Sequence, residues 1–148
     1  MRRTNEIIGA VGFASMLIRP GDCAVAMGLG DLPIAATSHY VNVMESAAIT
    51  ALAEFLEIGE TTRLLRIDVE AIEAVGIGAE IRATATCSEL RGRTIIFGCE
   101  IYEGERLVAR ATMTRAVVER VSFLARTAAQ SIVGQSNLGQ SIVGKNHE

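Results

Sequence analysis

Four stretches after residue 64 alternate apolar and polar residues, which is the pattern of half-buried β-strands. Turn-like segments containing Gly92 and Gly104 separate the last three stretches. Short turns between such strands predict an antiparallel meander with one buried face. The positions predicted to point inward are Leu65, Ile67, Val69 and Ala71; Ile81, Ala83, Ala85 and Cys87; Ile95, Phe97, Cys99 and Ile101; and Leu107, Ala109, Ala111 and Met113.

A different spacing precedes the meander. Apolar residues recur there three and four positions apart, which predicts a helix over residues 38–57. They are Val41, Met44, Ala48, Ala51, Leu52 and Phe55. Because this segment is apolar around most of its circumference, we expect the helix to be buried. We also expect a strand over residues 8–18, a helical turn near 22–27 and a last short helix over 120–130. The fold class is therefore predicted to be α+β, an antiparallel sheet that wraps one long helix.

Composition narrows the function classes. The 148 residues suit one domain of about 100–200 residues, and 49% hydrophobic content supplies a core. A net charge of −3 lacks the basic footprint of a nucleic-acid-binding protein. The three cysteines have neither zinc-site nor disulfide-framework spacing, so we expect no metal and a reducing cytoplasmic location. No segment reaches the ~18–20 apolar residues of a membrane span.

The two ends of the chain each allow two interpretations. Arg2 and Arg3 before the apolar stretch from Ile7 to Ile18 are similar to a signal peptide, but Glu6 and the following Pro20-Gly21-Asp22 argue against it. At the other end, Q-S-x-x-G occurs three times from Gln130 to Gly144. We expect one domain over residues 1–126 and an extension over 127–148. The extension is either flexible or surface-draped, or it docks on a subunit or partner.

Glu45 is the first candidate for chemistry. On a helical wheel it falls inside the apolar arc that contains Val41, Ala48 and Leu52, where an unpaired carboxylate is costly. Such an acid needs either a local hydrogen-bonding partner or a chemical role. Thr37, just before the helix, is either an N-cap or a functional hydroxyl.

Strand parity and helix position supply three further candidates. Glu73 and Arg115 point toward the helix if the odd face is inward, where they form an ion pair or a clamp for an anion. His39 falls on the opposite side of the helix from the apolar arc, so we expect it to be solvated or at an interface. Phosphate-binding loops, zinc-protease motifs and nucleophile elbows do not occur in the sequence.

Several segments together resemble the hotdog-fold thioesterases related to fluoroacetyl-CoA thioesterase, over roughly residues 8–120. The segments are Gly30-Asp31-Leu32-Pro33-Ile34-Ala35-Ala36-Thr37, Val41-Asn42-Val43-Met44-Glu45-Ser46-Ala47-Ala48, Phe55-Leu56-Glu57-Ile58-Gly59-Glu60, Glu89-Leu90-Arg91-Gly92-Arg93 and Thr114-Arg115-Ala116-Val117-Val118. The resemblance implies a hotdog homodimer, or a tetramer of such dimers, that hydrolyses an acyl-CoA thioester. It places the family's threonine at Thr37, its glutamate at Glu45 and a strand-end arginine near the site at Arg115.

The chain departs from the family pattern at Ala71, where the resemblance places a histidine. Ser38 also replaces a proline at the helix start. Either Glu73 or His39 replaces the histidine, or Glu45 and water suffice, or the protein only binds ligands. We therefore expect a short-chain acyl-CoA thioesterase with Glu45 and Thr37 as catalytic residues and with Arg115, Glu73 and His39 at the substrate. No cofactor is expected beyond the CoA of the substrate. The alternatives are a non-catalytic acyl-CoA-binding protein and a hotdog dehydratase or lyase.

Overall fold

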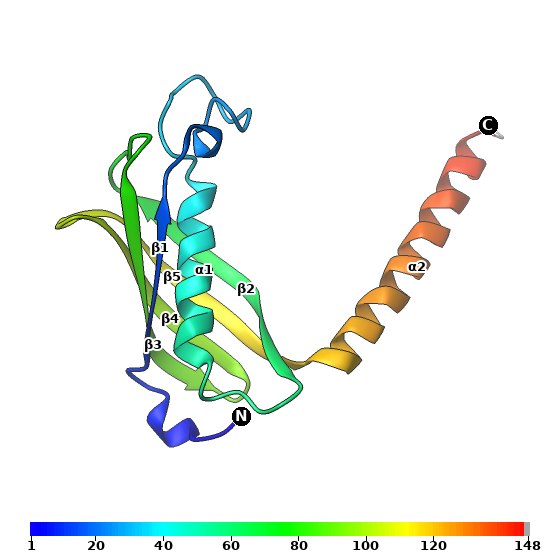
Figure 1. Ribbon diagram of the computed structural model, residues 1–148. Helices are drawn as coiled ribbons and strands as arrows, with labels where there is room; N and C mark the ends of the chain where they lie inside the picture. The colour runs from blue at the N-terminus through cyan, green and yellow to red at the C-terminus, as the bar shows by residue number, and fades with distance from the viewer. Residues whose placement is uncertain (147–148) are drawn as a thin grey trace.

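The computed structural model describes the chain from residue 1 to residue 146, with side chains as far as residue 135. The regular elements are, in chain order, η1 (Thr4–Glu6), β1 (Val11–Leu17), η2 (Pro20–Asp22), α1 (Ser38–Leu52), β2 (Glu60–Ala71), β3 (Glu80–Arg91), β4 (Thr94–Glu103), β5 (Arg106–Glu119) and α2 (Arg120–Asn146). The five strands form one antiparallel sheet in the order β1-β3-β4-β5-β2. The sheet curls around α1, which lies along its inner face (Figure 1). This arrangement confirms the predicted α+β hotdog fold.

The inner face of the sheet follows the predicted alternation closely in β3 and β4. All eight predicted inward positions of these two strands are at most 2% exposed. In β2 the parity slips, because a bulge lies between Leu64 and Arg66. Leu65 was predicted to point inward but is 45% exposed, and Leu64 packs against the core instead. A single extra residue in one strand therefore moves a side chain to the opposite face.

Helix α1 is buried as expected but is shorter than predicted. It ends at Leu52, whereas the apolar spacing predicted a helix to residue 57. Phe55 is still buried, and its amide donates to the Leu52 carbonyl oxygen in a tighter turn beyond the helix. The spacing of three and four residues correctly identified Met44, Ala48, Ala51, Leu52 and Phe55 as buried, whereas Val41 is only partly buried. Of these positions only Phe55 lies beyond the helix.

Gly12 of β1 is where the sheet comes closest to α1. A Cβ atom built on Gly12 would lie 1.9 Å from the Ala47 carbonyl oxygen and 2.4 Å from the Ala51 nitrogen. These distances leave no room for a methyl group, so only glycine allows strand and helix to approach this closely. The apolar stretch that is similar to a signal peptide thus contributes a strand to the sheet.

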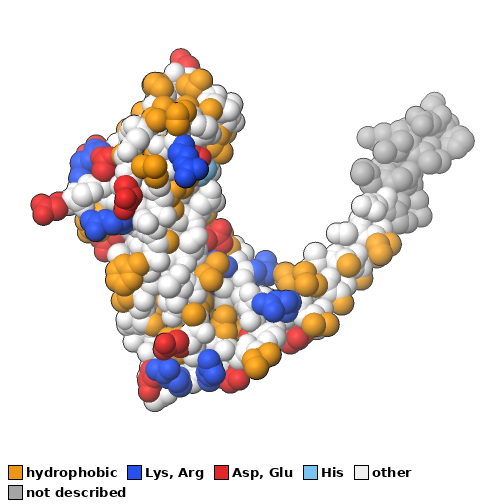
Figure 2. Space-filling view, in the orientation of Figure 1, with side chains coloured by type: hydrophobic (Ala, Val, Ile, Leu, Met, Phe, Trp, Pro, Cys, Tyr) orange, Lys and Arg blue, Asp and Glu red, His pale blue; other side chains and the backbone are white. Residues whose placement is uncertain are grey.

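Helix α2 is longer than the predicted helix over residues 120–130. It continues to Asn146 and so includes the backbone of the Q-S-x-x-G repeats. The repeats contain no proline, and each glycine costs only about 1 kcal/mol of helix stability relative to alanine. The helix extends away from the sheet rather than along it (Figure 1), and apolar side chains lie exposed on its first half (Figure 2). The division at residues 126 and 127, which falls within α2, stays a prediction.

Candidate active site

Glu45 and Arg115 meet on the inner face of the sheet. Arg115 lies on β5, and its Nη1 donates to Oε1 of Glu45, on α1, at 2.6 Å. The arginine side chain is 4% exposed, whereas the glutamate side chain is 32% exposed. A guanidinium in such a buried position requires a partner, and Glu45 provides it. The inward direction predicted for Arg115 is therefore correct, and its carboxylate partner is Glu45 rather than Glu73.

Thr62 of β2 holds the other side of the Arg115 guanidinium. Arg115 Nε donates to Thr62 Oγ1 at 2.9 Å, and Arg115 Nη2 donates to the Thr62 carbonyl oxygen at 3.2 Å. The hydrophobic pattern of the sequence does not single out Thr62. Its even position lies outside the predicted inward set, and only the bulge after Leu64 brings it to the inner side. The register in which β2 pairs with β5 would have placed Thr62 beside Arg115, but a single sequence does not reveal that register.

Thr37 occupies the N-cap position of α1, yet its side chain makes no capping hydrogen bond. Together with the preceding loop, it lines a small cavity of about 220 Å³. No hydrogen bond joins Thr37 to Glu45, whose Oε1 pairs with Arg115. Eight residues of helix also separate the two by about 12 Å along the axis. The Thr37 hydroxyl therefore makes no capping hydrogen bond, and within one chain it does not reach Glu45.

His39 is more enclosed than expected. Its side chain is 13% exposed, and Nε2 lies 3.5 Å from Asp22 Oδ1. This nitrogen is buried and has no hydrogen-bond partner among the described residues. His39 is therefore not solvated, because η2 places Asp22 beside its ring, and the alternative of an interface position stays a prediction. The other histidine of the sequence, His147, lies outside the described residues.

Glu73 does not join Arg115, contrary to the expected inward parity. Strand β2 ends at Ala71, and the Glu73 amide donates to the Val108 carbonyl oxygen beyond the strand. The Glu73 carboxylate is 52% exposed and lies 3.6 Å from Arg106. Ala71, where the family histidine was expected, is exposed at the end of this edge strand.

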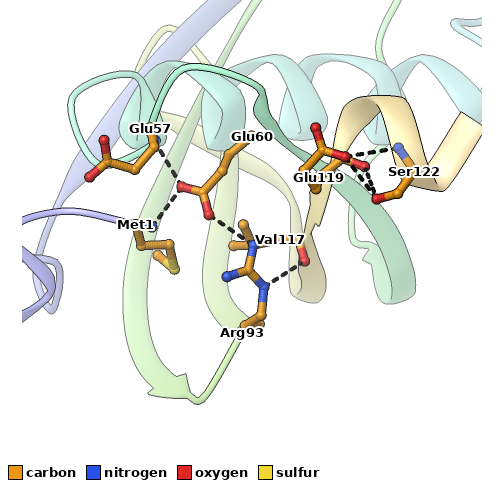
Figure 3. A network of polar contacts seen from close by, with 7 residues as sticks. All are labelled: Met1, Glu57, Glu60, Arg93, Val117, Glu119 and Ser122. Atoms are coloured by element: carbon orange, nitrogen blue, oxygen red, sulfur yellow. Dashed lines mark hydrogen bonds and ion pairs between the residues drawn. The ribbon is translucent and has the colours of Figure 1, made fainter.

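A second polar network lies at the rim, near the start of β2 and of α2 (Figure 3). Glu60 accepts from the Met1 amino group at 2.6 Å and from the Glu57 amide at 2.8 Å with Oε1, and from Arg93 with Oε2. The amino group holds the pKa of Glu60 at about 2, well below its ordinary value of 4.5. Beside it, Glu119 accepts from the Ser122 amide and so caps the first turn of α2. Groups from the N-terminus, from the segment before β2 and from the β3–β4 turn engage both oxygens of Glu60, so this network ties these segments together.

Cys87 and Cys99 are buried free thiols. Burial raises the pKa of Cys99 to about 11 and raises that of Cys87 as well, so both stay protonated near neutral pH. The described residues contain no group of three His, Cys, Asp or Glu side chains placed to hold a metal ion.

Comparison with known proteins decides the family. Residues 18–121 match the family described as FlK, fluoroacetyl-CoA-specific thioesterase. This chain belongs to that family. No curated protein sequence matches the chain. The family match ends at the first residues of α2, so nearly all of that helix lies outside it.

Solved structures show the same fold as this member of the fluoroacetyl-CoA-specific thioesterase family. The fluoroacetyl-CoA thioesterase FlK is 23% identical over 82% of this chain and 95% of its own, with a TM-score of 0.76. A thioesterase superfamily member from Thermus thermophilus is 19% identical over 87% of this chain and 96% of its own, with a TM-score of 0.80. A hot-dog-like protein from Thermanaerovibrio acidaminovorans is 17% identical over 87% of this chain and 96% of its own, with a TM-score of 0.76.

Family membership and fold together support an acyl-CoA thioesterase-like function for the chain. Among the described helices, none has the length and apolar character that crossing a membrane requires.

Proposed function

We propose that this protein hydrolyses a short-chain acyl-CoA thioester, with Glu45 as the catalytic carboxylate. The observation that carries the proposal is the one-sided engagement of Glu45. Arg115 binds Oε1, and no donor among the described residues binds Oε2. A carboxylate held by one oxygen on a buried helix, with a third of its side chain exposed, is both oriented and accessible.

Two routes use this arrangement. As a nucleophile, Glu45 Oε2 attacks the thioester carbonyl carbon, the C–S bond breaks, and the CoA thiolate takes a proton from water. A second water then cleaves the resulting anhydride and frees the acid and Glu45. As a general base, Glu45 instead removes a proton from the attacking water and returns it to the departing thiolate. In both routes the negative charge that develops on the carbonyl oxygen requires a hydrogen-bond donor.

Thr37 is the proposed donor to that oxygen across the interface of a dimer, because about 12 Å of helix separates it from the Glu45 of its own chain. Thr37 makes no capping hydrogen bond with its side chain, and it lines the cavity beside the N-terminal end of α1. Amide groups at this end of the helix add a favourable dipole for an oxyanion. His39 and Glu73 remain proposed substrate-side residues, each now with a known neighbour in Asp22 and Arg106.

We also propose that the active unit is a homodimer in the cytoplasm. β2 is an edge strand of twelve residues, and an edge of this length leaves a row of unpaired backbone groups that favours pairing. Leu65 and Ile72, in or next to β2, are 45% and 38% exposed, so a partner at this edge covers apolar surface. Light scattering of the purified protein tests this proposal. A molar mass of one chain contradicts it, and a mass of four chains indicates a pair of dimers.

Ala71 favours a second candidate function, a non-catalytic protein that binds acyl-CoA. Alanine cannot transfer a proton, and loss of a general acid–base group costs about 10²–10⁴ in rate. The only histidine in the described part of the chain is His39, whose ring faces Asp22.

Release of free thiol from acetyl-, fluoroacetyl-, butyryl-, aromatic and longer acyl-CoA substrates separates the two functions. We expect turnover of at least one short-chain substrate, and a loss of about 10²-fold or more in Glu45→Gln. The matched control is Glu100→Gln, which should keep full activity. Glu100 accepts a hydrogen bond from Tyr102 and makes no contact with Glu45 or Arg115.

Equal activity of Glu45→Gln and Glu100→Gln contradicts the catalytic role of Glu45. Saturable binding of CoA esters without turnover, combined with activity in Ala71→His, establishes the binding function instead. Circular dichroism of each variant checks that it is folded.

A further inference from the structure

Arg115 is an unusual arginine because it is 3% exposed and its contacts lie within the protein. Nη1 donates to Glu45 at 2.6 Å and lies 4.0 Å from the Met113 sulfur, while Nε and Nη2 donate to Thr62. All three guanidinium nitrogens therefore have a partner in the chain. A guanidinium engaged in this way is suited to hold Glu45 rather than to bind an anionic substrate group.

Thr62 is the residue that decides where this guanidinium lies. It provides two acceptors at once, the hydroxyl for Nε and the backbone carbonyl for Nη2. The carbonyl oxygen is present whatever the side chain, but only a hydroxyl at this position accepts from Nε. The two hydrogen bonds from Thr62 fix one edge of the guanidinium, whereas the carbonyl alone would allow the plane to pivot about Nη2. Rotation of the plane moves Nη1 and therefore moves the oxygen of Glu45 that Nη1 holds.

We propose that Thr62 is a positioning residue of the active site. It orients Arg115, and Arg115 orients Glu45 so that Oε2 is the oxygen that reacts. This inference rests on the proposed thioesterase function for its kinetic consequence, but not for its structural one. Thr62 comes from β2, Arg115 from β5 and Glu45 from α1, so the three-residue chain joins the edge strand to the helix across the inner face.

The test compares Thr62→Val, Thr62→Ser and Thr114→Val. Valine has the shape of threonine without the hydroxyl, and serine restores the hydroxyl alone. Thr114, next to Arg115 on β5, points to the opposite face of the sheet and is the matched control. All four proteins, wild type included, are assayed for thiol release and by NMR of the Glu45 carboxyl carbon and the Arg115 Nε–H.

We expect Thr62→Val to lower kcat about tenfold or more with little change in KM, because a group that only orients the catalytic carboxylate does not bind substrate. Thr62→Ser should recover most of the loss, and Thr114→Val should match wild type. In Thr62→Val the Arg115 Nε–H should exchange faster with solvent and the Glu45 carboxyl resonance should move.

The outcomes separate this inference from the proposed function. If wild type turns over substrate and Thr62→Val keeps the kcat of Thr114→Val, the positioning role is wrong while the thioesterase function stands. If no protein turns over any substrate, the proposed function fails, and the NMR data alone decide. A Glu45 resonance that moves in Thr62→Val but not in Thr62→Ser then supports the positioning role, and an unmoved resonance overturns it.

Discussion

Two glutamate–arginine ion pairs in this protein have similar contact distances, but the arginine is the buried partner in one pair and the glutamate in the other. In the inner pair, Arg115 is buried and Glu45 reaches solvent, with exposed fractions of 4% and 32%. In the rim pair, Glu60 is enclosed and Arg93 reaches solvent, with fractions of 10% and 57%. The contact distances are 2.6 and 2.8 Å.

The two carboxylates differ most in how their oxygens are used. Both oxygens of Glu60 are bound by groups of the protein, whereas only Oε1 of Glu45 is. An acid with both oxygens engaged holds segments together, and an acid with one free oxygen is available to a substrate. The carboxylate of the rim network and the proposed catalytic carboxylate therefore differ in how many oxygens the protein engages, not in the length of the ion pair.

The largest expected effect comes from disturbing the packing under the inner pair. Gly12→Ala places a methyl group against the backbone of α1, the helix that carries Glu45. We expect a loss of about 3 kcal/mol in the free energy of unfolding, at the upper end for overpacked cores. Gly98→Ala is the control, because its added methyl group meets no atom within 4 Å. Urea denaturation measures both, and equal stabilities contradict the close approach of β1 and α1.

Removal of the Glu45–Arg115 ion pair should lower the free energy of unfolding by less than Gly12→Ala does. Glu45→Leu leaves the buried Arg115 without its counter-charge, and we expect a loss of about 2 kcal/mol, below the range for fully enclosed pairs because Glu45 is partly exposed. The double variant Glu45→Leu/Arg115→Met should be more stable than Glu45→Leu alone. Denaturation of both proteins and of wild type measures the coupling. A double variant less stable than the single one argues against an uncompensated charge.

The rim pair should contribute less at neutral pH and show a distinct pH dependence. Glu60→Gln should lower stability by no more than about 1 kcal/mol at pH 7. Because the folded-state pKa of Glu60 is about 2 and its ordinary value is 4.5, its contribution is complete above about pH 5 and is lost as the pH falls toward 2. Thermal unfolding between pH 7 and pH 2 should therefore bring wild type and Glu60→Gln together. A difference that stays constant over this range contradicts the lowered pKa.

The smallest effect is expected from removing the end of α2. The described side chains of this helix between residues 127 and 135 are exposed, so none of them contributes to the core. The shortened protein should melt within a few degrees of the full chain and keep its thiol-release activity. A large drop in melting temperature would instead place the domain boundary beyond residue 126.

Local pattern predicted most of the elements. The alternation in β3 and β4 and the apolar spacing in α1 each report a backbone geometry that repeats every few residues, so they are readable without knowing what packs where. The same reasoning found Glu45, because a carboxylate inside an apolar arc is out of place wherever the helix lies. Strand parity also predicted that Arg115 points inward, and the start of the helix singled out Thr37, but the roles given to both residues came from the resemblance to a family.

The sequence by itself determined the α+β class, the buried helix and the acid on it, since hydrophobic periodicity follows from 3.6 residues per helical turn and two per strand repeat. Only the tertiary structure decided which residues meet. Arg115 is 70 positions from Glu45 and 53 from Thr62, and their contact depends on the pairing of β2 with β5. A one-residue bulge after Leu64 turned Thr62 inward, and the end of β2 at Ala71 left Glu73 outside. Register is a property of two strands together, so neither strand alone encodes the arrangement of the site.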